Sequence, residues 1–162
     1  MQRTLIADLS ERKGEEVLIN SWVHVARHQG KMAFFDFRDR SGTVQGVVFG
    51  KPEVLEVAKG IGEEYSVAVT GVVNERPAKM VNEKAENGGI ELEITNIEIL
   101  NESEAMPFDR EAELNIDTLL DYRPLTLRHP KTKAIFAIQA TITRAYGEYL
   151  RSIGFTEFQA PK

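Results

Sequence analysis

Three strand-like runs follow one another within residues 22–49, and no other part of the sequence constrains the fold as strongly. The first run ends at Val25, the second covers 32–38 and the third covers 43–49. A polar segment closed by Gly42 separates the second run from the third, which is a strong hairpin signal. The basic segment 27–31 predicts a loop between the first and second runs.

Aromatic residues in the second run indicate what this part of the chain could bind. Strand alternation sends Phe35 and Phe37 to one face and Phe34 to the other. One aromatic face can fill a core, which leaves Phe34 for stacking on a flat group such as a nucleobase. Together with the basic segment and the polar Gln45 on the next strand, this arrangement suggests a platform for single-stranded nucleic acid.

The rest of the first hundred residues completes a pattern of five strands and one helix. Residues 16–25 alternate as a long strand, expected to bend and serve two sides of a barrel, with Trp22 expected in the core. Pro52 starts a helix that ends near Gly60. Further strands follow at 65–74 and 90–100, the last with a phase change that predicts a bulge. The chain is therefore predicted to be mainly β, a five-stranded OB-fold Greek-key barrel with a helix between strands 3 and 4.

After the barrel the chain changes character. The predicted domains are an OB-fold domain at 1–102, a hinge at 103–129 and the truncated start of a second domain at 130–162. One long amphipathic helix is expected from Thr132 to Ile153, followed by a strand at 155–158. Because the helical apolar stripe needs a partner surface, we expect the sequence to be cut where a second domain starts.

Composition excludes several classes of protein. The chain has 162 residues, a formal net charge of −5 and no cysteine, so a disulfide scaffold, a cysteine-ligated zinc site and a cysteine nucleophile are excluded. The net negative charge favours localised contact with nucleic acid over wholesale coating of a polyanion. Histidines are too few and too poorly spaced to predict a metal site. No long apolar run or signal peptide is present, so a cytoplasmic protein without membrane contact is expected.

Several segments together resemble the aspartyl-tRNA synthetases, especially the archaeal type. The segments that carry the resemblance are Ser21-Trp22-Val23, Phe35-Asp36-Phe37-Arg38-Asp39-Arg40-Ser41-Gly42-Thr43-Val44-Gln45, Gly89-Ile90-Glu91-Leu92, Leu120-Asp121-Tyr122-Arg123, Leu127-Arg128-His129-Pro130 and, resembling class II motif 1, residues 154–162. The resemblance extends over the whole chain. It implies that the OB-fold domain at 1–102 is an anticodon-binding domain, which binds the tRNA anticodon loop, and that residues 130–162 are the truncated start of a class II catalytic domain.

The resemblance also implies roles for individual residues. Phe34 would stack on an anticodon base, Gln45 would read the central uridine, and Arg27 would hold the RNA backbone. Glu91 would accept a hydrogen bond from the amino group of the third base, a cytosine in the aspartate case. Further contacts to the tRNA are expected from His24, His28 and Lys31.

The resemblance implies that charging of tRNA with aspartate, the family's catalytic activity, needs motifs that this sequence does not contain. Motifs 2 and 3, with the arginines that bind ATP, are not in the chain, so it should be inactive alone. It should need no cofactor, whereas the full-length enzyme uses ATP and Mg²⁺. Motif 1 belongs to the dimer interface of the family, which implies a homodimer through Phe155 and Pro161.

Several alternatives remain open at this stage. Asparaginyl-tRNA synthetases share these features, and His24 resembles relaxed enzymes that charge both tRNA(Asp) and tRNA(Asn). A free-standing OB-fold protein that binds single strands without base preference is a second alternative, and a dimerisation module formed by residues 130–162 is a third. Phe34 could simply pack, and Gln45 and Glu91 could be solvated strand residues.

Overall fold

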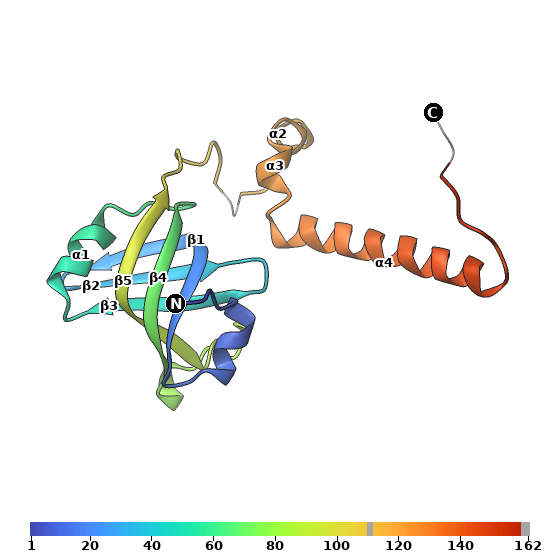
Figure 1. The fold of residues 1–162 in the computed structure, drawn as a ribbon. Helices are drawn as coiled ribbons and strands as arrows, with labels where there is room; N and C mark the ends of the chain where they lie inside the picture. Colours follow the sequence, from blue (N-terminus) through green and yellow to red (C-terminus); the bar gives the residue numbers. More distant parts are fainter. Residues whose placement is uncertain (110–111, 160–162) are drawn as a thin grey trace. The chain divides into compact units, whose positions relative to one another are not determined.

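The structure, a computed structural model, describes residues 1–109 and 112–159, and they form two compact units, 1–105 and 106–162 (Figure 1). The elements of the first unit are η1 (Ile6–Glu11), β1 (Glu16–Gln29), β2 (Met32–Arg38), β3 (Thr43–Phe49), α1 (Pro52–Lys59), β4 (Ser66–Glu75), η2 (Ala78–Met80) and β5 (Ile90–Asn101). Those of the second are α2 (Ile116–Asp121), α3 (Arg123–Thr126) and α4 (Pro130–Ser152).

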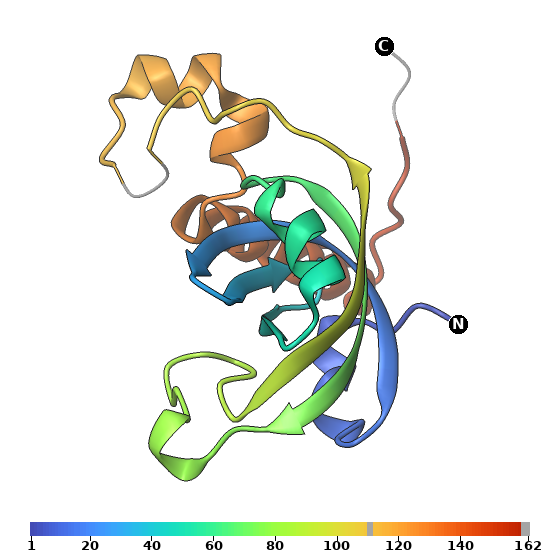
Figure 2. The ribbon, with the colours of Figure 1, turned by 90° about the vertical axis from the view of Figure 1, so that its left-hand side faces the viewer.

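The first unit is a closed five-stranded barrel, which confirms the predicted OB-fold. The strands follow the order β1-β2-β3-β5-β4 around the barrel, and α1 lies between β3 and β4 in the chain. Strand β1 is long enough to pair with β4 through residues 16–22 and with β2 through residues 22–29. Strands β3 and β5 run parallel, and their pairing closes the barrel. Figure 2 shows the strands of the barrel from another side.

Alternation along each strand fills the barrel core. The side chains of Phe35 and Phe37 are fully buried and stack with their ring centroids 5.5 Å apart. Helix α1 adds Val54 and Ala58 to the same cluster. Most of the core therefore comes from residues that the period-2 pattern assigns to one face.

The phase change predicted in the last strand is a bulge at Thr95. Opposite it, Thr70 pairs with Asn96 and Gly71 pairs with Ile94, so Thr95 has no partner of its own. The Thr95 hydroxyl donates to the carbonyl oxygen of Thr70 at 3.1 Å. The extra residue lets β5 present Ile94 and Ile97 to the same core.

Two expectations about β1 are wrong. The segment predicted as a basic loop is mostly strand: β1 continues to Gln29, and Gly30 and Lys31 alone form the turn to β2, with Gly30 at φ +60°. Trp22 is 41% exposed and not in the core, because alternation with the buried Val23 turns it outward. The Arg38 guanidinium lies over its ring, 5.5 Å from the centroid.

The described residues of the second unit form three helices, joined and followed by segments without regular structure. The side chain of Asn115 caps α2 by accepting from the Thr118 N–H at 2.8 Å. The long helix predicted at 132–153 is present as α4, whose apolar stripe is exposed. The predicted strand at 155–158 is wrong, since no segment in the described part of the chain pairs with these residues and they form no regular element.

Candidate nucleic-acid interface

The outer face of β1, β2 and β3 carries three of the predicted binding residues, Arg27, Phe34 and Gln45. On β2, Phe34 is half-buried and faces outward between the fully buried Ala33 and Phe35. Cross-strand pairing puts Arg27 opposite Phe34, and Gln45 opposite Asp36. Residues 18 positions apart in the chain thus lie on the same surface.

A shallow hollow of about 230 Å³ on this surface is lined by Arg27, Gln29, Phe34 and Gln45. Arg27, Phe34 and Gln45 are predicted tRNA contacts, and the structure brings them together. Gln29 is a lining residue that the sequence interpretation missed because it was assigned to a loop. Had the strand been extended to residue 29, the two-residue spacing from Arg27 would have indicated a shared face.

An ion pair holds Arg27 at the edge of the hollow. Its Nη2 lies 3.3 Å from Oδ2 of Asp36, and about half of the Arg27 side chain remains exposed. Asp36 therefore braces Arg27. The irregular register between Val23 and Val25 causes this, because it shifts the pairing of all later residues of β1. An exposed pair of this kind leaves the guanidinium available to a phosphate group.

Arg76 links the two residues predicted to read base edges. It follows β4 directly, and its Nη2 donates a hydrogen bond to Oε1 of Gln45. Its Nε lies 3.6 Å from Oε2 of Glu91, and only 9% of the Arg76 side chain is exposed. Glu91 itself remains 30% exposed. The sequence pattern does not predict the role of Arg76, because alternation does not give the direction of a side chain beyond the end of a strand.

The turn between β2 and β3 is held by the carboxylate of Asp39. It accepts from the Ser41 N–H at 2.7 Å, the Ser41 hydroxyl at 2.6 Å and the Ile6 N–H at 3.1 Å. Burial alone would raise the pKa of Asp39, but these hydrogen bonds and that of the Gly42 N–H outweigh it and hold the pKa below its ordinary value. This network fixes the hairpin register and so the position of Gln45.

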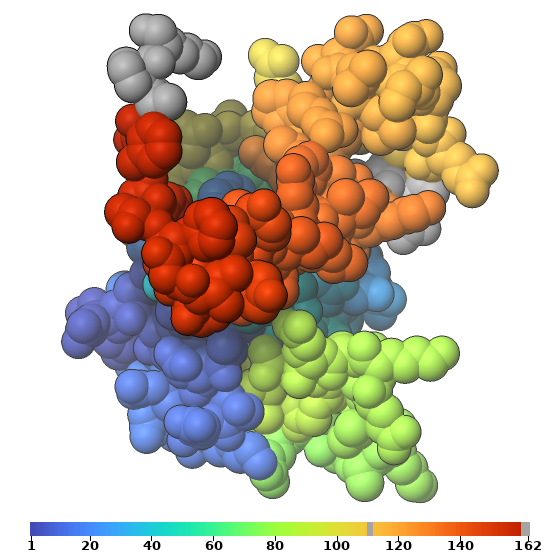
Figure 3. All heavy atoms as spheres, turned by 90° about the vertical axis from the view of Figure 1, so that its right-hand side faces the viewer, coloured from blue at the N-terminus to red at the C-terminus, as the bar shows by residue number. Residues whose placement is uncertain are grey.

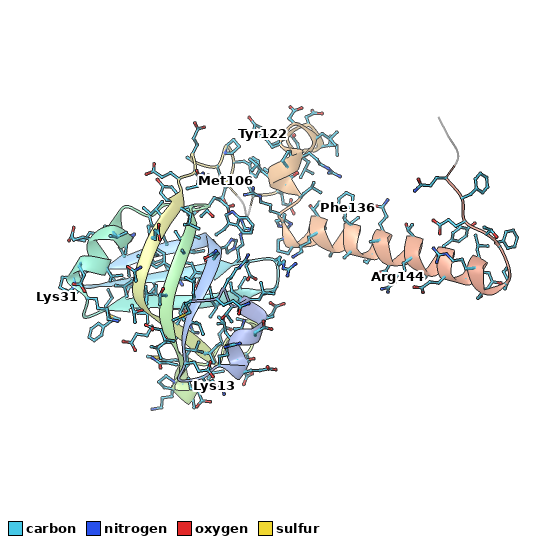
Figure 4. All side chains as sticks on the ribbon, viewed as in Figure 1. Lys13, Lys31, Met106, Tyr122, Phe136 and Arg144 are labelled. Carbon is cyan, nitrogen blue, oxygen red and sulfur yellow. The ribbon has the colours of Figure 1, made fainter. Side chains whose placement is uncertain are left out.

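The other predicted site residues lie elsewhere. His28 points to the opposite side of β1 from Arg27, with its ring edge-on to Phe35 at 6.0 Å. His24 is half-buried at the register shift of β1. Lys31 lies exposed at the hairpin tip (Figure 4). Phe155 is exposed after α4, and Pro161 lies outside the described residues.

Metal and membrane sites receive no support from the residues that the structure describes. Nowhere in 1–109 and 112–159 do three or more histidine, aspartate or glutamate side chains gather as metal ligands would. In the same ranges, no helix combines the length and the apolarity that crossing a bilayer requires.

The barrel and its basic, aromatic outer face define a class of protein, the OB-fold nucleic-acid-binding modules. Residues 17–100 match the family model tRNA anti-codon, described as an OB-fold nucleic acid binding domain. The match covers just over half of the chain, and the chain belongs to this family.

Individual relatives are aspartate– and asparagine–tRNA ligases. The chain is 39% identical to the aspartate–tRNA ligase of Staphylococcus epidermidis over 91% of its length, which is 26% of that protein. Identity is also 39% to the aspartate–tRNA(Asp/Asn) ligase of Corynebacterium aurimucosum, over 93% of this chain and 26% of the relative. The chain is 37% identical to the asparagine–tRNA ligase of Desulforamulus reducens, over 99% of this chain and 36% of that protein.

Solved structures give the same result. The asparaginyl-tRNA synthetase of Pyrococcus horikoshii, in complex with asparaginyl-adenylate, superposes with a TM-score of 0.83 at 31% identity, over 99% of this chain and 37% of that one. The aspartyl-tRNA synthetase of Entamoeba histolytica superposes with a TM-score of 0.88 at 25% identity, over 100% of this chain and 40% of that one. The chain thus spans about a quarter to two fifths of the lengths of these relatives.

Proposed function

We propose that this chain recognises a tRNA anticodon loop as the N-terminal part of an aspartate–tRNA ligase. One observation supports this most directly. The hollow on the outer face of the barrel is lined by Arg27, Phe34 and Gln45, the residues to which the family resemblance gives anticodon contacts. A guanidinium, an aromatic ring and an amide around one hollow can contact phosphate, base face and base edge respectively.

Each of these residues has a role in the proposal. Phe34 stacks on an anticodon base, and Arg27 binds the backbone beside it. Gln45 reads the central uridine, and the partly exposed carboxylate of Glu91 accepts from the amino group of the third base, cytosine. The exposed Lys31 adds charge at the hairpin tip. His24 and His28 lie away from the hollow and have at most peripheral contacts with the RNA.

Residues 130–162 have a separate role in this proposal. We assign them to the start of a class II catalytic domain, after a hinge at 103–129, with Phe155 and Pro161 in a homodimer interface. By the family resemblance, binding of ATP and Mg²⁺ is assigned to the part of the longer relatives that this chain does not span, where motifs 2 and 3 lie. The cytoplasm is the proposed location.

Asparagine–tRNA ligase is the second candidate, and one observation favours it specifically. The asparagine enzyme of D. reducens matches 99% of this chain, and the C. aurimucosum relative is named for both tRNA(Asp) and tRNA(Asn). The two cognate anticodons differ only at the third base. Recognition of that base, which we assign to Glu91, therefore separates the two candidates.

The test is a titration with the tRNA(Asp) anticodon stem-loop and with a copy whose third anticodon base is changed from C to U, at two salt concentrations. A preference for C of more than about 1 kcal/mol, the size of one edge contact, supports the aspartate specificity and the role of Glu91. Equal binding to both supports relaxed specificity, and a preference for U supports the asparagine enzyme.

A scrambled loop is the control in this titration. If it binds as tightly as both anticodon loops, the module is an OB-fold protein that binds single strands without base preference, and the proposal is wrong. Two salt concentrations separate backbone contacts, which weaken with salt, from stacking and base-edge contacts.

A further inference from the structure

We propose that Arg76 is a positioning residue that sets the hydrogen-bonding polarity of the anticodon-reading face, by holding the amide of Gln45 so that its NH₂ group faces the RNA. This inference rests on the proposed function, since it concerns how Gln45 tells one base from another. In this inference Arg76 determines specificity through Gln45, without contacting the base itself.

Arg76 is built into the barrel from two sides. Its backbone N–H donates to the carbonyl oxygen of Gly89 at 2.9 Å, where the loop 76–89 between β4 and β5 begins and ends. The side chain is nine-tenths buried beneath the outer face, and its Nε has no hydrogen-bond partner among the described residues. The loop beyond it projects from the first unit (yellow-green in Figure 3). Burial restricts the guanidinium to the position between Gln45 and Glu91.

The contact with Gln45 removes an ambiguity of the amide group. An amide has an acceptor oxygen and a donor NH₂ of nearly the same size, so a free glutamine can present either one. A guanidinium carries donors only, so it fixes the oxygen of Gln45 on its own side. The NH₂ group is then the part of Gln45 that is left for a ligand in the hollow.

This polarity selects among pyrimidines. Uracil presents the O4 acceptor on the edge where cytosine presents its N4 amino donor. A fixed NH₂ group on Gln45 can donate to O4 of uracil, but it faces the amino group of cytosine donor to donor. If the amide could turn over, its oxygen would accept from cytosine and the discrimination would be lost.

Glu91 completes the arrangement with the opposite polarity. One of its oxygens, Oε2, faces Arg76, and the carboxylate as a whole can only accept hydrogen bonds. It therefore suits a base with an amino donor. The buried guanidinium of Arg76 thus lies between Gln45, which donates a hydrogen bond to a base, and Glu91, which accepts one. This pair fits a uridine followed by a cytosine.

The test compares Arg76→Met with the unaltered chain. The Met side chain keeps the buried apolar volume and removes the donors. Each protein is titrated with the anticodon stem-loop carrying U or C at the central position. We expect the unaltered chain to prefer U by about tenfold or more, and Arg76→Met to reduce that preference to about threefold or less. Binding of the U loop itself should change much less than the ratio.

Two controls separate positioning from other roles. Lys79→Met removes a positive charge from an exposed position of the same loop and should leave the U-to-C ratio unchanged. If Arg76 instead contacts a phosphate, Arg76→Met will weaken binding of both loops equally and lower the salt dependence by about one released ion, which would overturn the inference. Thermal unfolding of each variant shows whether the barrel is intact.

A measurement without RNA tests independently whether Arg76 orders the amide of Gln45. In the free protein, the side-chain NH₂ signals of Gln45 in ¹⁵N spectra should show an ordered amide that becomes mobile in Arg76→Met. An equally ordered amide in both proteins would overturn the inference. If the unaltered chain does not distinguish U from C, the proposed function fails, and this measurement alone decides the role of Arg76.

Discussion

At the scale of single residues, Phe34 and Phe35 are adjacent in sequence and face opposite ways. We predict that Phe34→Ala weakens binding of the anticodon stem-loop by about 1–3 kcal/mol, the contribution of one stacked base. Its unfolding free energy should change little, because the ring is only half-buried. Titration and denaturant unfolding measure the two quantities.

The matched control is Phe35→Ala. Its ring is fully buried, so the substitution should lower the unfolding free energy by about 3–5 kcal/mol. A Phe34→Ala variant that binds as tightly as the unaltered chain, or that loses as much stability as Phe35→Ala, would contradict the assignment of the two faces.

Asp39 gives a second prediction at this scale, concerning pH. A carboxyl whose pKa is lower in the folded state stabilises the fold above its unfolded-state pKa, and that contribution disappears as pH falls through the folded-state value. Asp39→Asn should therefore cost about 1.5–3 kcal/mol of unfolding free energy at pH 7, and the difference should shrink as pH falls below 3.8. Denaturant unfolding between pH 7 and pH 2.5 measures it.

Glu75→Gln is the control for the pH experiment. The pKa of Glu75 is also lowered, by a hydrogen bond from Lys13 and by the charge of that ammonium, but this pair lies on the exposed surface. Solvent screens it, so the substitution should leave the unfolding free energy unchanged. A constant difference between Asp39→Asn and the unaltered chain at every pH would show that the carboxylate charge is not what stabilises the turn.

At the scale of elements, the β1–β2 hairpin sets the geometry of the hollow. Gly30 has φ +60° with open space where a Cβ would lie, so the cost of Gly30→Ala is purely conformational. We predict a loss of about 1–2 kcal/mol in unfolding free energy. Gly89 also has open space but no positive φ, so Gly89→Ala should stay within about 0.5 kcal/mol of the unaltered chain. Equal effects in denaturant unfolding would contradict the left-handed turn.

The sequence predicts elements better than it predicts contacts between them. Period-2 alternation is local, so the pattern shows the faces of Phe34 and Phe35, the β5 bulge and the order of the strands along the chain. The end of β1 is not visible in the pattern. Residues 27–29 are polar and exposed because that part of the strand does not cover the core, and a polar run resembles a loop.

The contact of Arg76 with Gln45 could not be predicted either. The two residues are 31 positions apart, and closure of the barrel brings them together. Arg76 also lies one residue beyond β4, where alternation no longer fixes the direction of a side chain. The site was therefore predictable where strands determine it and not where a loop residue enters it.

At the scale of the whole molecule, the chain divides into two compact units, and the boundary in the sequence lies between Ala105 and Met106. The barrel has its own closed sheet and its own core, so it should not need the second unit to fold. We predict that a fragment of residues 1–105 unfolds cooperatively and binds the anticodon stem-loop within about threefold of the full chain. Loss of the folded barrel in this fragment would show that the units depend on each other.

The apolar stripe of α4 leads to the last prediction, self-association of the chain. Ile135, Ile138, Ile142 and Tyr149 recur at helical spacing and are 57–63% exposed, far above what a helix of an isolated monomer leaves in water. Since a second copy offers the same stripe, we expect a dimer at micromolar concentrations in analytical ultracentrifugation. Ile142→Glu should abolish it, whereas Ala140→Glu, on the opposite side of the helix, should not. A chain that stays monomeric at all concentrations would mean that a different surface covers this stripe.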